Sequence, residues 1–263
     1  MKNTRTFWLA SSIAIISFIG FAMVACDTTT SSNGNGTQNG NGNGNGSQNG
    51  NVHLGDTFML TDWVYSREWD EDNDDEVTLV RFDGDRAVTA YVEGRLGDDW
   101  IDVPVGTGTI DGGRLNISIG RPATASLVPM EDLFDWFDDI TVSNPVARGQ
   151  ILWNLTTSNG RVEREYRSWH DDGMSSVENK VFYVFVDSDV RVSGEEYTSM
   201  WSDMGEAGSF TQEAFTLDLR KGWNVVHMMM EYIFTQTVTG FFRADTETLA
   251  LANPASVIWV LRE

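Results

Sequence analysis

The chain is poor in the residues that form covalent cross-links or metal sites. It has 263 residues but only one cysteine, three histidines and three lysines. A single cysteine excludes an internal disulfide and a thiolate metal site. The histidines His53, His170 and His227 are far apart and lack partners at metal-ligand spacing. The folded part must therefore be stabilised by packing.

Positive charge is also scarce. Lys and Arg number 18 against 39 Asp and Glu, which gives a net charge of −21. Proteins that bind nucleic acid cluster Lys and Arg against the phosphate backbone, whereas here acids are spread along the chain. The composition therefore excludes nucleic acid as an expected partner.

Catalytic sequence motifs are missing as well. The chain contains no Walker loop, GxSxG elbow, HExxH pair, dinucleotide fingerprint or SxxK motif. No catalytic residue is therefore predicted. A carboxylate-dependent hydrolase such as a glycosidase stays open as an alternative, because it needs only two suitably spaced acids among the 39.

The N-terminus reads as an export signal. Lys2 and Arg5 precede an uncharged apolar run over residues 7–24, the layout of a secretory signal peptide. The segment Met23-Val24-Ala25-Cys26 resembles the lipobox of bacterial lipoproteins, although Met23 stands where that family usually has Leu. The resemblance implies removal of residues 1–25 and lipid on Cys26, which would anchor the protein to a membrane of the cell envelope, on its periplasmic or outer surface. An uncleaved signal anchor is the alternative, since the run approaches the length that spans a bilayer.

A low-complexity segment follows the cysteine. After Asp27 and up to Asn51 the chain contains only Thr, Ser, Asn, Gln and Gly. No alternating apolar runs flank its Asn-Gly pairs, so a flexible tether over residues 26–51 is favoured over hairpins. A Gly-rich coil of this length spans roughly 25 to 30 Å. An acidic β-rich domain is predicted over residues 52–263, and any boundary inside it would fall near residues 170–179.

Short alternating segments separated by turn residues predict a mainly β fold. Turns are expected at Asp83-Gly84, at residues 111–113 and at residues 158–160, and Leu115–Ile119 alternates with period two. The order of segments favours an antiparallel β-sandwich or barrel over a repeated βαβ pattern. Strands are predicted at residues 57–65, 77–82, 87–92, 100–110, 114–119, 150–157, 162–169, 180–187, 190–193, 215–219, 223–234, 237–243 and 257–261.

One short helix is predicted near residues 129–138. Met130, Leu133, Phe134 and Phe137 fall on one helical stripe, behind a proline and two acids that suit a helix N-terminus. Packing of this stripe into the core is favoured over a membrane or cofactor role.

Part of the first half is similar to lipocalin-like barrels. The similarity rests on residues 60–63, Leu-Thr-Asp-Trp, followed by residues 79–85, and Thr61 stands where that family has a glycine. It implies a barrel that carries an apolar ligand in a cavity open at one end.

The densest acidic run, residues 70–76, offers oxygen ligands to a cation. Asp70, Asp72 and Asp74 alternate as the ligands of calcium loops do. Asp75 and Arg81 occupy the positions of the glycine and the bidentate glutamate of an EF-hand, so the run is not one. A calcium site and a solvated acidic loop that deters edge-to-edge aggregation are the two interpretations, the second being favoured, and no other cofactor is expected.

Tryptophans near acidic loops suggest a ligand surface. Exposed aromatic rings can stack on sugars while carboxylates hold the hydroxyls, and the candidates are Trp69, Trp100, Trp169 and Trp201. Trp136, Trp223 and Trp259 are interpreted as core residues. The expected function is a non-catalytic binding or structural module of the cell envelope, with a glycan or protein ligand; the alternatives are the hydrolase and the lipocalin-like carrier.

The anchor gives the first testable prediction. Mass spectrometry of the mature protein should find a lipid-modified Cys26 as its N-terminal residue, and cells should label it with radioactive fatty acid. Cys26→Ala should abolish the label. A Cys26→Ala protein that still partitions with membranes would indicate the uncleaved signal anchor instead.

Overall fold

The computed structural model describes residues 52–69, 77–96, 99–137, 139–169, 174–203, 206–237 and 240–263. These residues are mostly β, as predicted, and no helix among them is long and apolar enough to cross a membrane. In chain order the elements are β1 (His53–Gly55), β2 (Phe58–Trp69), β3 (Val77–Arg81), β4 (Arg86–Leu96), β5 (Asp99–Asp111), β6 (Arg114–Ile119), the 3-10 turn η1 (Thr124–Ser126), β7 (Val128–Pro129), α1 (Met130–Leu133), β8 (Ile140–Val142), β9 (Arg148–Leu152), β10 (Asn154–Thr157), β11 (Gly160–Trp169), β12 (Ser175–Val186), β13 (Val190–Gly194), β14 (Tyr197–Asp203), β15 (Glu206–Gln212), β16 (Phe215–Leu219), β17 (Gly222–Thr237), β18 (Gly240–Ala250) and β19 (Ile258–Arg262).

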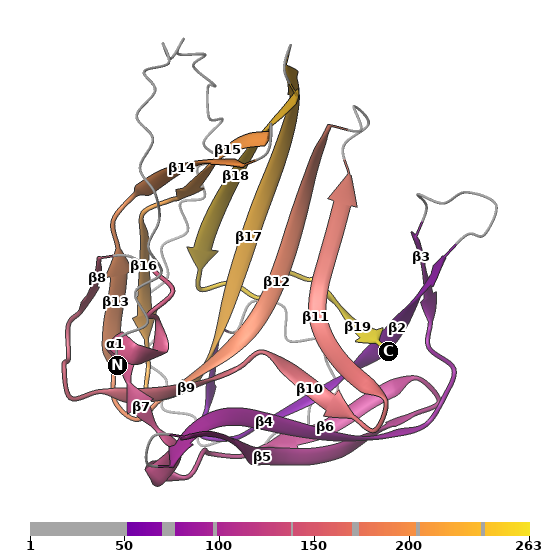
Figure 1. Ribbon diagram of the computed structural model, residues 1–263. Helices are drawn as coiled ribbons and strands as arrows, with labels where there is room; N and C mark the ends of the chain where they lie inside the picture. The colour runs from indigo at the N-terminus through magenta and orange to yellow at the C-terminus, as the bar shows by residue number, and fades with distance from the viewer. Residues whose placement is uncertain are drawn as a thin grey trace, which may run out of the picture. The chain divides into compact units, whose positions relative to one another are not determined.

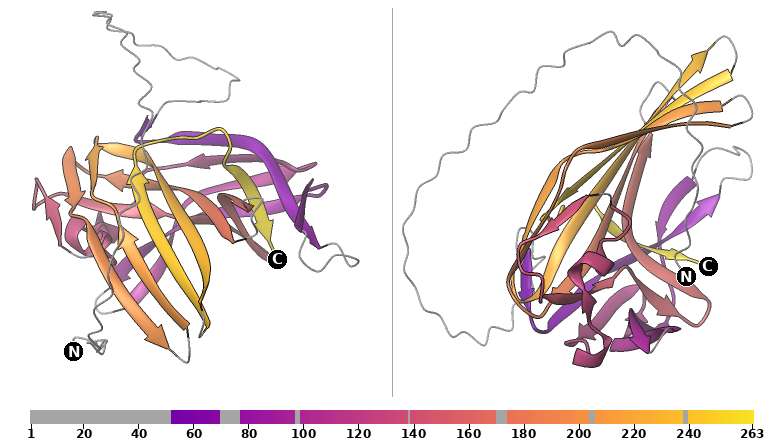
Figure 2. Two further views of the ribbon diagram at one scale, coloured as in Figure 1. Left: turned by 90° about the horizontal axis from the view of Figure 1, so that it is seen from above. Right: turned by 60° about the vertical axis from the view of Figure 1, so that its left-hand side comes forward.

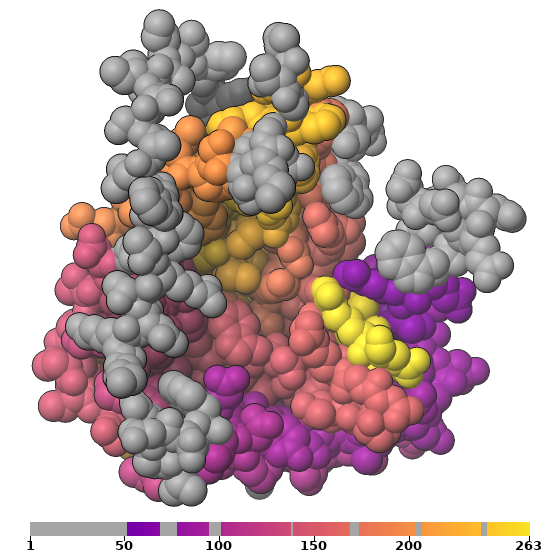
Figure 3. Space-filling view, viewed as in Figure 1, coloured from indigo at the N-terminus to yellow at the C-terminus, as the bar shows by residue number. Residues whose placement is uncertain are grey.

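Seven strands close a barrel (Figure 1). Their order is β10, β4, β5, β6, β2, β19 and β11, and pairing of β10 with β11 completes the circle. Every pair is antiparallel except β2 with β19, which is parallel. Figure 3 shows the C-terminal strand, in yellow, between β2 and the salmon-coloured β11. The predicted barrel is thus confirmed, with its closure made by the last strand of the chain.

The barrel interior is filled by side chains. Alternate residues of β6 point inward, and Leu115, Ile117 and Ile119 are buried together with Val64 and Leu155 from other strands. Such contiguous burial of branched apolar side chains is the packing of a core.

Strand β12 belongs to two cores. Beyond β11 the sheet continues through β12, β17, β18, β15 and β14. Every residue from Val181 to Val186 is buried, and successive side chains point to opposite faces of a strand. Tyr183 and Phe185 join the barrel core, whereas Phe182 and Val184 join a second core. The second core is completed by the three-stranded sheet of β16, β13 and β8 and by the segment around α1.

The predicted helix is present but shorter than the stripe suggested. α1 has four residues, and the chain leaves the helical conformation at Phe134 (φ −117°). All four stripe residues, Met130, Leu133, Phe134 and Phe137, are nevertheless buried in the second core. A single turn is a poor helix by itself, so tertiary packing of the stripe holds this segment.

The turn predicted at residues 111–113 is present, and strands on both sides of residues 170–173 pair with each other. Gly112 and Gly113 between β5 and β6 both have positive φ, and a Cβ on Gly113 would lie 1.9 Å from the carbonyl oxygen of Phe82. Strands β11 and β12 pair directly, with Trp169 opposite Ser176, so the sheet is continuous across the proposed boundary near residues 170–179.

A sheet extension, composed of β14, β15 and residues 241–247 of β18, projects beyond the two cores (Figure 2). The main contacts of β14 are with β15, and those of β15 are with β14 and β18, all within the sheet. The sequence did not predict β14 or β15, because their Ser, Gly and Thr residues show little apolar alternation.

The double role of β12 predicts coupled cores. Phe182→Ala and Phe185→Ala should each lower the free energy of unfolding by about 3 to 5 kcal/mol through the cavity left behind. Both variants should unfold in one denaturant transition, because the two cores share a strand. Val146 is exposed, so Val146→Ala should change the free energy of unfolding by less than about 0.5 kcal/mol. Separate transitions for the two cores would contradict this view.

Candidate functional site

The candidate site is one side of the sheet, here called the polar face, which carries Arg67 of β2, Glu165 of β11, Glu178 of β12, Tyr232 of β17 and Asp245 of β18. Cross-strand register places these side chains on the same side: Glu165 lies opposite Lys180, Tyr232 opposite both Ser176 and Asp245. Strands distant in sequence thus build one continuous polar surface.

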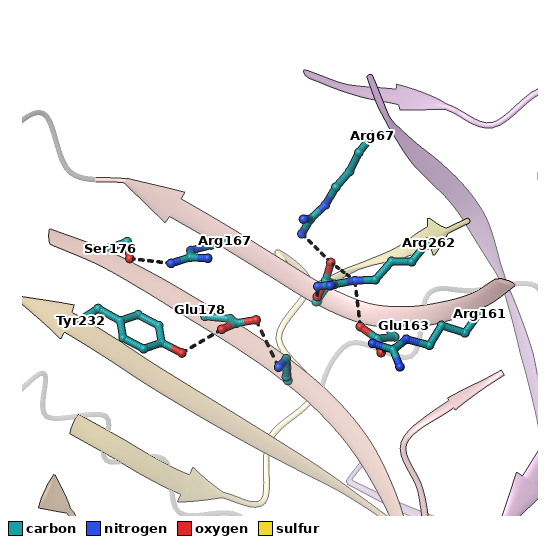
Figure 4. A network of polar contacts seen from close by, with 10 residues as sticks. Arg67, Arg161, Glu163, Arg167, Ser176, Glu178, Tyr232 and Arg262 are labelled. Carbon is teal, nitrogen blue, oxygen red and sulfur yellow. Dashed lines mark hydrogen bonds and ion pairs between the residues drawn. The ribbon is translucent and has the colours of Figure 1, made fainter. Parts of the chain in front are cut away.

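Glu165 lies at the centre of an ionic network at one end of the barrel. Its side chain is only 2% exposed, and Arg67 Nη2 donates to its Oε1 at 2.7 Å; Figure 4 labels Arg67 and the other arginines of this network, Arg161 and Arg262. Arg262 donates to the same carboxylate and also pairs through Nε with Glu163 at 2.9 Å, and Arg161 pairs with Glu163 at 2.7 Å. A buried charge is tolerated only when paired in this way. The network joins β2, β19 and β11 where the barrel closes.

A second group surrounds Glu178. Lys180 Nζ lies 3.2 Å from its Oε1, and the Tyr232 hydroxyl donates to its Oε2 at 3.0 Å. Burial opposes ionisation, but Lys180, the Tyr232 hydrogen bond and Arg167 together lower the pKa of Glu178. Burial and the neighbouring carboxylate raise the pKa of Tyr232 to about 12. Glu178 is therefore held ionised and Tyr232 neutral.

Arginines also cover the aromatic rings of this face. The Arg243 guanidinium lies 4.8 Å from the centre of the Tyr232 ring and 5.8 Å from that of Phe234, and its Nε donates to Asp245 at 2.7 Å. Arg167 lies 5.4 Å from the Tyr232 ring. The cation–π contacts link β11, β17 and β18, and the Arg243–Asp245 ion pair lies within β18.

Two buried polar side chains stand apart from these networks. Gln212 and Glu247 are opposite each other on β15 and β18 and are 2% and 6% exposed. Among the described residues, neither Gln212 Nε2 nor Glu247 Oε1 has a hydrogen-bond partner. Burial raises the pKa of Glu247, and the positive charge of Lys180 offsets part of this effect. The polar face therefore holds two carboxyls, Glu178 and Glu247, whose pKa values are shifted in opposite directions.

Two hollows open on the surface of the domain. One has a volume of about 470 Å³ and is lined by Ser66, Arg67, Phe82, Leu261, Arg262 and Glu263. The other has a volume of about 380 Å³ and is lined by Thr141, Ser193, Gly194, Glu195, Glu196, Ala214, Phe215 and Thr216. Both are open and largely polar, unlike the apolar barrel cavity expected of a carrier.

The structure describes one of the four predicted tryptophan platforms in full. The Trp201 side chain is 36% exposed, and its ring lies so close to Gly208 that a Cβ there would be 2.4 Å from it. Trp69, Trp100 and Trp169 belong to β2, β5 and β11, but their side chains lie outside the described part.

The predicted metal ligands and lipidation site also lie outside the described residues. These are Asp70, Asp72 and Asp74 of the acidic run, and Cys26. Within the described ranges, no three His, Cys, Asp or Glu side chains are grouped as metal ligands. The calcium interpretation of the acidic run stays a prediction.

Two exposed tryptophans were missed from sequence. Trp136, interpreted as a core residue, is 44% exposed, and Trp153 is 40% exposed, with the two ring centres 5.5 Å apart. Trp136 falls off the apolar stripe of residues 130–137, a signal that it faces outward. Trp153 lies where the predicted strand 150–157 breaks into β9 and β10, which no local pattern indicates.

A comparison of the chain with protein-family models, with curated proteins and with solved structures found no match.

The opposite pKa shifts predict opposite pH dependences of stability. A carboxyl with a raised native pKa contributes stability at low pH that is lost as pH rises from its unfolded pKa through its native pKa. Glu247→Gln should therefore gain stability relative to the wild type as pH rises through that window. Glu178 has a lowered pKa, so its contribution is present above the unfolded pKa and is lost as pH falls through the native one.

Urea unfolding of the wild type, Glu247→Gln and Glu178→Gln across pH 3 to 8 measures both effects. Relative to the wild type, Glu178→Gln should be least stable near neutral pH. Parallel pH curves for the three proteins would contradict the assignment.

Proposed function

We propose that this protein is a lipid-anchored, non-catalytic binding module of the cell envelope whose ligand is a glycan. The address is inferred from the leader and from the lipobox-like segment ending at Cys26. The tether up to Asn51 precedes the described domain, which starts at Val52, so the domain would work within a few nanometres of the membrane surface.

Exposed aromatic side chains are the observation that carries the binding proposal. Exposed aromatic residues that lie together mark a surface for another molecule, and the Trp136 and Trp153 rings are both exposed and in contact. Their rings can stack on the C–H face of a sugar, and the surrounding carboxylates can accept hydrogen bonds from its hydroxyls. Among the residues whose side chains the structure describes, the exposed aromatic ones are Trp136, Trp153, Tyr166, Tyr197, Trp201 and Phe241.

A carboxylate-dependent hydrolase is the second candidate. Glu178 and Glu247 both lie opposite Met230, on the strands that flank it, and their pKa values are shifted apart as those of an acid and a base would be. Against this, Lys180 and Tyr232 occupy the two oxygens of Glu178, and neither hollow contains this pair. A glycosidase would need both carboxyls to reach the scissile bond, so binding is favoured.

An apolar carrier fits the described residues less well. The centre of the barrel is filled by buried side chains such as Leu115, Ile117 and Trp259. A lipocalin barrel also has eight antiparallel strands around its cavity, whereas this barrel has seven, with one parallel pair. A packed interior of this kind leaves no room for a lipid-sized ligand.

The proposal predicts retention of a glycan without turnover. The mature protein in a sugar-free zwitterionic detergent should bind a subset of an array of bacterial envelope glycans. After prolonged incubation, a reducing-end assay should detect no new chain ends. Release of reducing ends that Glu178→Gln or Glu247→Gln abolishes would establish the hydrolase instead, and failure to bind any glycan would refute the proposed ligand class.

A further inference from the structure

Trp136 and Trp153 form a paired aromatic surface at the edge of the second core. Their ring centres are 5.5 Å apart and the ring planes are inclined by 56°, so the rings meet at an angle and do not stack flat on one another. Each keeps a large part of its side chain in solvent. The pair thus presents two apolar faces that the protein itself leaves uncovered.

Buried aromatic residues hold both rings in place. Trp136 packs on Phe134 and Phe137, with ring centres 5.4 Å and 5.1 Å apart, and Trp153 packs on Phe182 at 4.3 Å. These three phenylalanines are buried in the second core. Rings fixed in this way lose little side-chain entropy when a ligand covers them, so the surface is pre-organised for binding.

Carboxylates lie beside the pair in the sequence. Asp135 adjoins Trp136, and Asp132 lies one turn earlier at the end of α1; both are exposed. Neither carboxylate takes part in an ion pair within the described ranges, in contrast to Glu163, Glu165 and Asp245 on the polar face. Their carboxylate oxygens are therefore available as hydrogen-bond acceptors.

We infer that Trp136 and Trp153 form a carbohydrate-binding site that takes a pyranose ring, whose C–H face packs on the indoles while Asp135 accepts hydrogen bonds from its hydroxyls. This inference rests on the proposed glycan-binding function and locates its principal contact. A pyranose combines an apolar face with a rim of hydroxyl donors, which matches an exposed aromatic pair with an exposed carboxylate next to it in the sequence. A protein partner would instead need a larger surface, of the order of 800 Å² on each side.

The alternative is that the two tryptophans only cover the second core. The substitutions Trp136→Phe and Trp153→Phe separate the two roles, because a phenyl ring keeps most of the packing on Phe134 and Phe182 but offers less surface to a sugar. Asp135→Asn separates them further, since its exposed carboxylate supports no described contact of the fold. Ile233→Ala is the control: it removes an apolar side chain of similar exposure (43%) from β17, away from the proposed aromatic contacts.

The experiment measures affinity for pyranose oligosaccharides, both neutral and amide-bearing, by titration calorimetry with the mature protein in sugar-free detergent. Thermal unfolding of each variant is recorded in parallel. Trp136→Ala and Trp153→Ala should weaken binding on the order of tenfold or more, in keeping with loss of a central aromatic contact. The two Phe variants and Asp135→Asn should weaken it severalfold at an unchanged melting temperature, while Ile233→Ala should bind as the wild type does.

The outcomes distinguish the two proposals. If the wild type binds a pyranose and the Phe and Asn variants bind it equally well, the Trp136–Trp153 site is refuted and the glycan-binding function stands. If the wild type binds no pyranose, the proposed function fails. Binding of peptides without any binding of sugars would also overturn the assignment to carbohydrate.

Discussion

The rest of the structure depends on the burial of both faces of β12. A strand at the surface of a two-layer β protein alternates buried and exposed residues, but residues 181–186 are buried without interruption. Tyr183 and Phe185 complete the barrel core, and Phe182 and Val184 form the floor of the second core. One strand thus determines where the barrel ends, where the three-stranded sheet packs and from which point the sheet continues outward.

The outward part of the sheet is stabilised differently, by contacts between neighbouring strands. Glu178 and Asp245 each pair with a cation two residues away on their own strand, and Tyr232 connects neighbouring strands by donating to Glu178 and by its ring contact with Arg243. Cross-strand contacts such as those of Tyr232 stabilise a sheet where no second layer covers it. Acids outnumber basic residues in the chain, and the arginines of the polar face neutralise carboxylates that would otherwise repel one another. In the part of the chain that the structure describes, Asp132 and Asp135 near Trp136 form no such ion pair, unlike the carboxylates of the polar face.

Local sequence patterns predicted most strands and turns, because the formation of these elements depends mainly on residues that are neighbours in the chain. The period-two alternation of residues 115–119 and the glycines after Asp111 both appear where expected. Residues 197–212 were missed, since β14 and β15 form by pairing along β18 and carry few apolar residues. The exposed tryptophan pair was missed for the same reason. Trp153 faces outward because the chain breaks there between β9 and β10. That break depends on distant partners, since β9 pairs with β12 whereas β10 pairs with β4 and β11.

The sequence by itself determined the β class, the positions of its tight turns and the apolar stripe of residues 130–137. These are properties of short segments, where periodicity and backbone preference decide. Only the tertiary structure decided that β19 closes the barrel beside β2, that β12 serves two cores and that Trp136 and Trp153 meet at the surface. Each of these depends on residues far apart in the chain, because burial and exposure are set by which strands pair and not by the identity of a single side chain.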